Sequence, residues 1–155
     1  MTASPGRLLG VDYGTVRIGL AITDPDRKVA SPLETYTRKT LEFDAAYLAK
    51  LVVDRGITGI VLGLAIGLNG HEGPKAKECR AFGAWLESAT GLRVVFGDER
   101  FTSALADDIM FQAKMNKQKR GERRDMLAAT LILQGFLEGG CAGYEPQPTD
   151  QTHDV

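Results

Sequence analysis

The sequence predicts an α/β fold in which a mixed five-stranded sheet carries helices on both faces. Three strand-like segments open the chain in direct succession, at 7–12, 16–23 and 28–36, and this order favours an antiparallel meander. Two apolar segments, 57–64 and 92–96, each follow a stretch with helical spacing, which is typical of right-handed crossovers to parallel strands. Two more helical segments complete the predicted order β-β-β-α-β-α-β-α-α.

Bulk composition limits what the chain can be. Its 155 residues suffice for one domain with a real core, and contents of 43% hydrophobic and 25% charged residues are ordinary for a globular protein. A net charge of −1 excludes a global basic field, so nucleic-acid binding needs a local patch. We interpret Cys79 and Cys141 as reduced thiols of a cytoplasmic protein, and no run is long and apolar enough to span a membrane.

The first two strands hold the most informative side chain, Asp12. Leu8, Gly10 and Asp12 share one face of the strand, and both faces are apolar until Asp12 is reached. A carboxylate there is costly unless it is compensated. Asp12 is therefore either a functional ligand or a strand-end acid that caps the turn, and at this point the two interpretations are even. Gly14 supplies that turn, and Gly19 lets another backbone come close.

Helix signals follow the third strand. Thr40 is placed as the N-cap of a helix that ends at Arg55, with Gly56 just beyond it. The strand at 57–64 is apolar throughout, as expected for a central parallel strand. A glycine-rich loop at 67–74, in which the role of His71 stays open, leads to a helix at 75–89.

The last third of the chain combines a strand, helices and a basic stretch. The strand at 92–96 precedes Glu99, and a helix from Thr102 or Ser103 runs to about Met115. We expect a polar, basic loop at 115–124, a final helix at 123–137, and a disordered tail. The domain boundaries are thus 1–139 for one folded domain and 140–155 for the tail.

Three carboxylates fall at positions that this topology brings together, namely Asp12, Glu99 and Asp125. The first two follow strands whose C-terminal ends are the usual ligand-binding edge of such a sheet. Asp125 is expected to open the final helix and to lie on its apolar stripe, because Ala128, Ala129, Ile132 and Leu133 follow at helical spacing. The competing interpretation is an acid that stabilises the helix dipole from the first turn.

Clustered carboxylates repel one another, and a hard divalent cation removes that cost. Mg²⁺ is bound by a few carboxylates while it keeps several waters, and a pair of such ions about 4 Å apart can cleave phosphodiesters. With only two histidines and no Cys-x-x-Cys, the sequence argues against zinc.

Four motifs occur in a recognisable order: Gly10-Val-Asp-Tyr-Gly-Thr-Val-Arg-Ile-Gly19, Gly63-Leu-Ala-Ile-Gly-Leu-Asn-Gly-His-Glu-Gly-Pro74, Asp98-Glu-Arg-Phe-Thr-Ser103 and Arg124-Asp-Met-Leu-Ala-Ala-Thr-Leu-Ile-Leu133. Together they resemble the YqgF or RuvX-like family of the ribonuclease H-like superfamily, over about residues 6–138. The resemblance implies a ribonuclease H-like fold and a nuclease that matures the 5′ end of 16S ribosomal RNA. Holliday-junction resolution is the older assignment.

Carried over motif by motif, the resemblance implies that Asp12, Glu99 and Asp125 are metal-binding catalytic acids and that Mg²⁺ or Mn²⁺ is the cofactor. The chain departs from the usual family pattern at Ala65, Gly67, Asn69 and Arg124, where proline, asparagine, aspartate and valine are common. None of these departures removes an acid. They bear on the loop and on substrate preference.

A local basic stretch is available for phosphate contacts. Six basic residues fall within eleven positions beside Asp125, namely Lys114, Lys117, Lys119, Arg120, Arg123 and Arg124, and such side chains are suited to contact phosphates. The alternative interpretation is a solvated linker without a binding role. Arg17 and Arg100 are further candidates, although Arg100 is equally suited to pair with an acid. Precursor ribosomal RNA is the favoured partner and branched DNA the alternative. The sequence leaves open whether the chain is a monomer or a homodimer.

Two other functions compete with nuclease activity. Related domains serve as non-catalytic nucleic-acid-binding modules, although retention of all three acids argues against that role here. The Asp12-Tyr-Gly-Thr15 segment also resembles the first phosphate loop of sugar kinases and actin-like ATPases. Those proteins enclose their nucleotide with a second domain, for which 155 residues leave no room.

Overall fold

The computed structural model describes residues 4–65, 72–98 and 117–139. Eight helices and strands are assigned within these ranges. In chain order they are β1 (Arg7–Asp12), β2 (Arg17–Thr23), β3 (Ala30–Thr37), α1 (Leu41–Asp54), β4 (Ile57–Leu64), α2 (Pro74–Thr90), β5 (Val94–Asp98) and α4 (Lys117–Glu138).

The five strands form one mixed sheet in the order β3-β2-β1-β4-β5. β2 pairs antiparallel with both β1 and β3, whereas β4 runs parallel to β1 and to β5. The predicted meander and the two parallel crossovers are therefore confirmed. The C-terminal ends of β1, β4 and β5 lie at one edge of the sheet, where the first turn, between β1 and β2, also lies.

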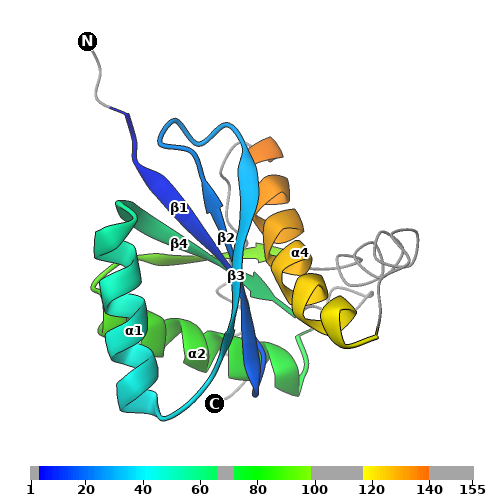
Figure 1. The fold of residues 1–155 in the computed structure, drawn as a ribbon. Helices are drawn as coiled ribbons and strands as arrows, with labels where there is room; N and C mark the ends of the chain where they lie inside the picture. Colours follow the sequence, from blue (N-terminus) through cyan, green and yellow to red (C-terminus); the bar gives the residue numbers. More distant parts are fainter. Residues whose placement is uncertain (1–3, 66–71, 99–116, 140–155) are drawn as a thin grey trace.

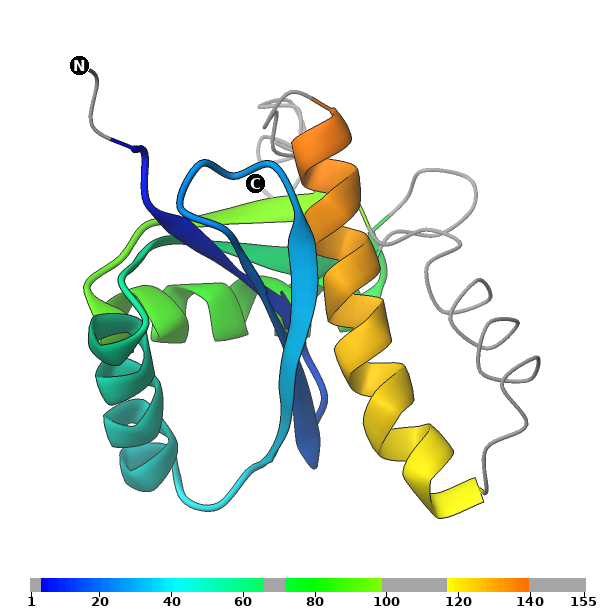
Figure 2. The same cartoon turned by 45° about the horizontal axis from the view of Figure 1, so that its top comes forward.

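The helices divide between the two faces of the sheet. α4 lies across one face and contacts all five strands, while α1 and α2 cover the other face (Figures 1 and 2). Each face has its own apolar core. The core under α1 and α2 contains large side chains such as Leu9, Ile18 and Leu62, and the core under α4 includes Leu8, Ala21 and Leu133.

Two predicted boundaries are wrong. β5 runs to Asp98 rather than ending at 96, because parallel pairing with β4 continues through Gly97 and Asp98. α4 begins at Lys117, so the stretch expected to be a basic loop up to Arg124 is helical from Lys117 onward. Lysine, arginine, glutamine and glutamate are good helix formers, so local propensity accounts for the longer helix.

Several predictions fall outside the described residues. They concern the loop around His71, the acid Glu99 with its neighbour Arg100, the helix at 102–115, and Lys114, Cys141 and the tail. Cys79 is described, and its side chain is buried. Among the helices of the described ranges, none combines the length and the apolar character that a membrane span requires.

Candidate active site

Asp12 is the last residue of β1 and lies half-buried on the α4 face of the sheet. The face follows from strand alternation, since Leu8 and Gly10 on the same side both contact α4. A Cβ built on Gly10 would lie 2.8 Å from the Cβ of Leu133, which shows how closely the helix covers β1. The Asp12 side chain therefore leaves the strand toward the helix.

Gly19 brings α4 up to Asp12. It is the antiparallel partner of Asp12 in β2, so the two residues lie side by side and face the same way. A Cβ built on Gly19 would lie 1.9 Å from the backbone oxygen of Asp125, a separation that no side chain can occupy. The glycine thus permits a contact between backbones, as the sequence predicted, and places Asp125 next to the partner of Asp12.

Asp125 lies on the sheet-facing side of α4. Ala128, Ala129, Ile132 and Leu133, on the same stripe, are all buried, while Asp125 itself is half-buried at the end of that stripe. The prediction that it opens the helix is wrong, since α4 begins about two turns earlier, at Lys117. Because dipole effects fade beyond the first turn, stabilisation of the helix dipole does not explain this acid.

Arg17 is the partner of Asp125 in this structure. Its Nε donates to Oδ2 of Asp125 at 2.7 Å, and the side chains remain 43% and 21% exposed. The guanidinium also lies against Gly121, one turn earlier in α4, where an added Cβ would be 3.4 Å from Nη2. An exposed pair of this kind contributes little to stability, so Arg17 can exchange Asp125 for another anion at small cost.

Basic residues follow the same end of α4. Arg123 and Arg124 are exposed in the helix. Just before them, the backbone oxygen of Glu122 accepts a hydrogen bond from the hydroxyl of Thr35 on β3. Lys117, Lys119 and Arg120 belong to the first turn of α4, although their side chains are outside the described part. The predicted basic stretch is therefore carried by a helix that packs on the sheet.

The donor chemistry suits a hard divalent cation. Asp12 and Asp125 offer carboxylate oxygens from neighbouring backbone positions, the ligand type that Mg²⁺ prefers. Gly19 lets the Asp125 backbone pack directly against the strand partner of Asp12. The described residues contain no group of three acidic, histidine or cysteine side chains able to hold a metal ion. The third predicted acid, Glu99, is outside those ranges.

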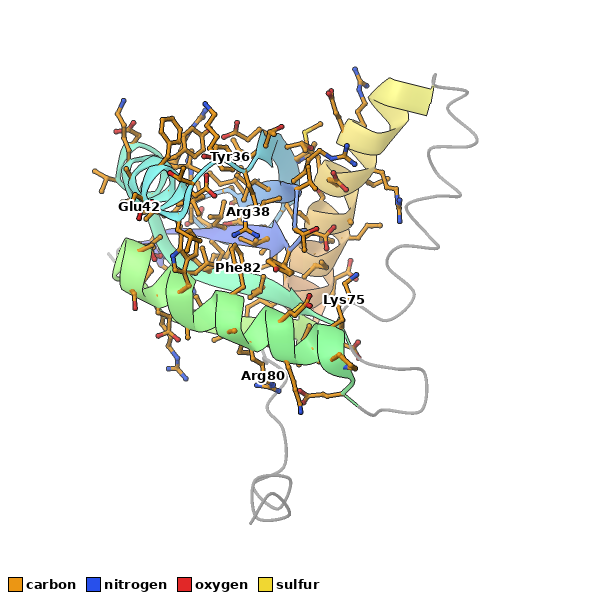
Figure 3. All side chains as sticks on the ribbon, turned by 90° about the horizontal axis from the view of Figure 1, so that it is seen from below. Tyr36, Arg38, Glu42, Lys75, Arg80 and Phe82 are labelled. Atoms are coloured by element: carbon orange, nitrogen blue, oxygen red, sulfur yellow. The ribbon has the colours of Figure 1, made fainter. Side chains whose placement is uncertain are left out.

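Sequence reasoning missed two ion pairs that border this edge. Glu72 accepts two hydrogen bonds from Arg80 of α2, at 2.7 and 2.8 Å, and Arg38 lies 3.6 Å from buried Asp44. Arg38 and Arg80 are both visible in Figure 3. A partial signal existed for Asp44, which stands four residues before buried Leu48 and therefore on the inner face of α1. Arg38 had none, because neither its contact with Asp44 nor its contact with Gly14 follows a helix or strand period.

The chain matches the family model of RuvX, described as Holliday junction resolvase, over residues 6–139. A protein of Rhodopirellula baltica named "Putative pre-16S rRNA nuclease" is 44% identical over 156 residues, covering 96% of this chain and 90% of its own length. A protein of Rhodobacter capsulatus with the same name is 43% identical, with coverage of 86% and 84%.

Solved structures match the fold at low sequence identity. Thermus thermophilus RuvC in complex with a Holliday junction substrate has a TM-score of 0.57 at 14% identity, covering 88% of this chain and 98% of its own. The resolvase of Fowlpox virus, solved with Holliday junction DNA, has a TM-score of 0.53 at 12% identity, with coverage of 88% and 99%. These similarities show a fold shared with resolvases of the ribonuclease H-like kind, as the sequence predicted.

Proposed function

The chain belongs to the RuvX family, and from that premise we propose that it is a metal-dependent nuclease that acts on precursor 16S ribosomal RNA. The contact of the Asp125 backbone with Gly19, the strand partner of Asp12, is the observation that carries this proposal. Relatives that match over most of their length and are named for pre-16S ribosomal RNA support the substrate.

In this proposal Asp12, Glu99 and Asp125 hold Mg²⁺ or Mn²⁺. When bound, the ion would activate water for attack and offset negative charge at the scissile phosphate. The role of the chain is to present carboxylates at fixed positions. The β1–β2 ladder fixes Asp12, and the packing of α4 on Gly19 fixes Asp125.

Arg17 has two partners in this proposal. It holds the Asp125 carboxylate in the structure described above, and its exposed guanidinium is also able to bind a phosphate of the substrate. Arg123 and Arg124 are exposed on the same helix, and Arg100, Lys117, Lys119 and Arg120 complete the proposed phosphate contacts. Such contacts hold a nucleic acid without reading its sequence.

The test replaces Asp12 with asparagine, which preserves shape and removes the charge. We expect cleavage of labelled precursor 16S RNA with Mn²⁺ to fall by at least about 100-fold, since the acid acts directly at the metal. Thermal unfolding should change little. Asp54→Asn is the matched control, because Asp54 is exposed at the far end of α1 and only pairs with Lys50 at 3.9 Å. Unchanged cleavage by Asp12→Asn would contradict the proposal.

The family description favours one alternative substrate, the four-way DNA junction. The same assay run on a labelled junction separates the two. If the protein cleaves the junction but not the RNA, and Asp12→Asn abolishes that cleavage, the proposed mechanism holds with DNA as the substrate. Tight RNA binding without cleavage at any Mg²⁺ or Mn²⁺ concentration would instead identify a binding module.

A further inference from the structure

Arg38 joins the short segment between Asp12 and Arg17 to the rest of the fold. It follows β3 directly, and its backbone N–H donates to the oxygen of Val16 at 2.9 Å. Its Nη1 donates to the oxygen of Gly14 at 3.3 Å. Both acceptors belong to the turn that connects β1 to β2, so one residue holds two points of that turn.

Among the described residues, strand pairing stops on both sides of this turn. The β1–β2 ladder ends at the pair formed by Asp12 and Gly19, and the β2–β3 ladder ends at Arg17 and Thr37. Arg38 follows the last residue of β3, and its hydrogen bond to Val16 connects the chain after β3 to the turn where the two ladders stop. Gly14 makes the turn tight, since a Cβ there would lie 2.2 Å from the backbone oxygen of Arg17.

The Arg38 side chain is itself fixed from both sides. Its guanidinium lies 5.6 Å from the ring centroid of Tyr13 and 5.3 Å from that of Phe82, distances at which a cation is attracted to an aromatic face. Figure 3 shows Arg38 between Tyr36 and Phe82, over the end of the sheet. Tyr13 and Phe82 also pack on each other, with centroids 4.6 Å apart.

Asp44 anchors the arrangement in the core. Its carboxylate is 1% exposed, lies 3.6 Å from Nε of Arg38, and accepts hydrogen bonds from the Tyr36 hydroxyl at 2.6 Å and the Lys39 N–H at 2.9 Å. Burial and the adjacent Asp44 carboxylate raise the pKa of Tyr36 well above its usual range, so the hydroxyl keeps its proton and donates. A buried acid with three partners cannot move without losing them.

We propose that Arg38, held by Asp44, is a positioning residue that fixes the Asp12 carboxylate for metal binding through the turn at 13–16. The inference rests on the proposed function. Groups that orient a metal ligand without touching the metal typically alter affinity by about 10- to 100-fold. Arg38 acts on Asp12 through the backbone of the turn and through Tyr13, the residue that follows Asp12 in the chain.

The chain offers a matched control at the opposite edge of the sheet. Arg27 also ties a turn between strands to neighbouring groups, because it donates to the backbone oxygens of Gly6 and Pro5 and to the Thr58 hydroxyl. It lies in the turn between β2 and β3, far from Asp12 along both strands. Arg27→Met and Arg38→Met thus remove comparable side chains, one at each edge.

The experiment titrates Mn²⁺ alone into the full chain by calorimetry and measures the Mn²⁺ concentration for half-maximal cleavage of precursor RNA. Arg38→Met should weaken Mn²⁺ binding and raise that concentration by at least about 10-fold, with activity partly recovered at saturating Mn²⁺. Hydrogen exchange of the amides at 13–16 should speed up. Arg38→Lys should be intermediate, since lysine keeps the charge and loses the planar fork.

Arg27→Met should lower thermal stability without changing Mn²⁺ binding. If both methionine variants shift Mn²⁺ binding equally, or if neither does while wild type is active, Arg38 is only a structural residue and the inference is overturned. Faster exchange at 13–16 with unchanged Mn²⁺ binding would also overturn it. A wild-type chain that neither binds Mn²⁺ nor cleaves would overturn the proposed function as well, which separates the two failures.

Discussion

The two faces of the sheet are built from side chains of different size. Toward α1 and α2 the strands present large apolar residues, including Leu9, Val11 and Leu62. Toward α4 they present Gly10, Gly19, Gly59, Gly97 and Ala21 beside the larger Leu8 and Val61. The glycines on this second face let the backbone of a helix approach the backbone of the strands.

This difference assigns a separate task to each face. Burial of large side chains is the main source of stability, at roughly 25 cal/mol per Å² of apolar surface. Close approach of a helix contributes less burial but fixes the position of what the helix carries. α4 carries Asp125, and its backbone meets Gly19 beside Asp12. Substitutions on the α4 face should therefore affect the site, and those on the α1 and α2 face, apart from the contacts that hold Arg38, should affect stability.

The substitution Gly19→Ala should have the largest effect on activity. Its Cβ would lie 1.9 Å from the Asp125 oxygen, so α4 must move away from β2. We expect a loss of at least about 3 kcal/mol in the free energy of unfolding and at least about a 100-fold loss of cleavage, since a shift near 1 Å at a site costs that much. Urea unfolding and an RNA cleavage assay measure the two quantities.

Gly59→Ala is the control for that experiment. Gly59 lies in β4 on the same face, and the nearest atom to an added Cβ is the flexible end of the Leu8 side chain, at 3.0 Å. It should cost far less stability and leave cleavage unchanged. Equal loss of cleavage in both variants would show that the α4 face responds as a whole and that Gly19 has no special role.

A large-to-small change on the other face should reverse the pattern. Leu62 is fully buried in β4 among residues of the core under α1 and α2. Leu62→Ala should lower the free energy of unfolding by about 2–5 kcal/mol through lost burial and a cavity. Cleavage per folded molecule, measured well below the unfolding midpoint, should stay within about two-fold of wild type. A large loss of activity in folded Leu62→Ala would refute the division between faces.

Much of the fold followed from local patterns. Apolar runs and turn residues predicted all five strands, and Thr40 was correctly placed as a helix N-cap, where its side chain accepts from the Phe43 N–H. The start of α4 was missed because the residues before Asp125 are charged and give no apolar period, although their helix propensity is good.

The candidate site was partly predictable for the same reason. Strand alternation put Asp12 on the face of Gly10, and helical spacing put Asp125 on the buried stripe. The sequence also required a backbone near Gly19, but only the structure identifies that backbone as Asp125. The ion pair of Arg17 with Asp125 joins residues that are distant in sequence, and the contact of Arg38 with Asp44 bridges a strand end and a helix without any helix or strand period.

The smallest effect is expected at the ion pair of Glu72 with Arg80, which joins the residues before α2 to that helix. The bidentate hydrogen bonds from the Arg80 guanidinium hold the pKa of Glu72 below its usual range. A carboxyl whose pKa is lower in the folded state stabilises the fold above the unfolded pKa, near 4.5 here. That contribution disappears as the pH falls through the folded pKa.

Glu72→Gln should therefore lower the free energy of unfolding at neutral pH by about 1 kcal/mol, and this deficit should shrink as the pH falls below about 4.5. Urea unfolding of wild type and variant at several pH values measures the difference. Asp54→Asn, which removes an exposed partner of Lys50, is the control for the loss of a surface carboxylate. The pair of Glu72 with Arg80 joins the segment just before α2 to that same helix, so cleavage should not follow the deficit. A parallel loss of cleavage would show that α2, too, positions the site.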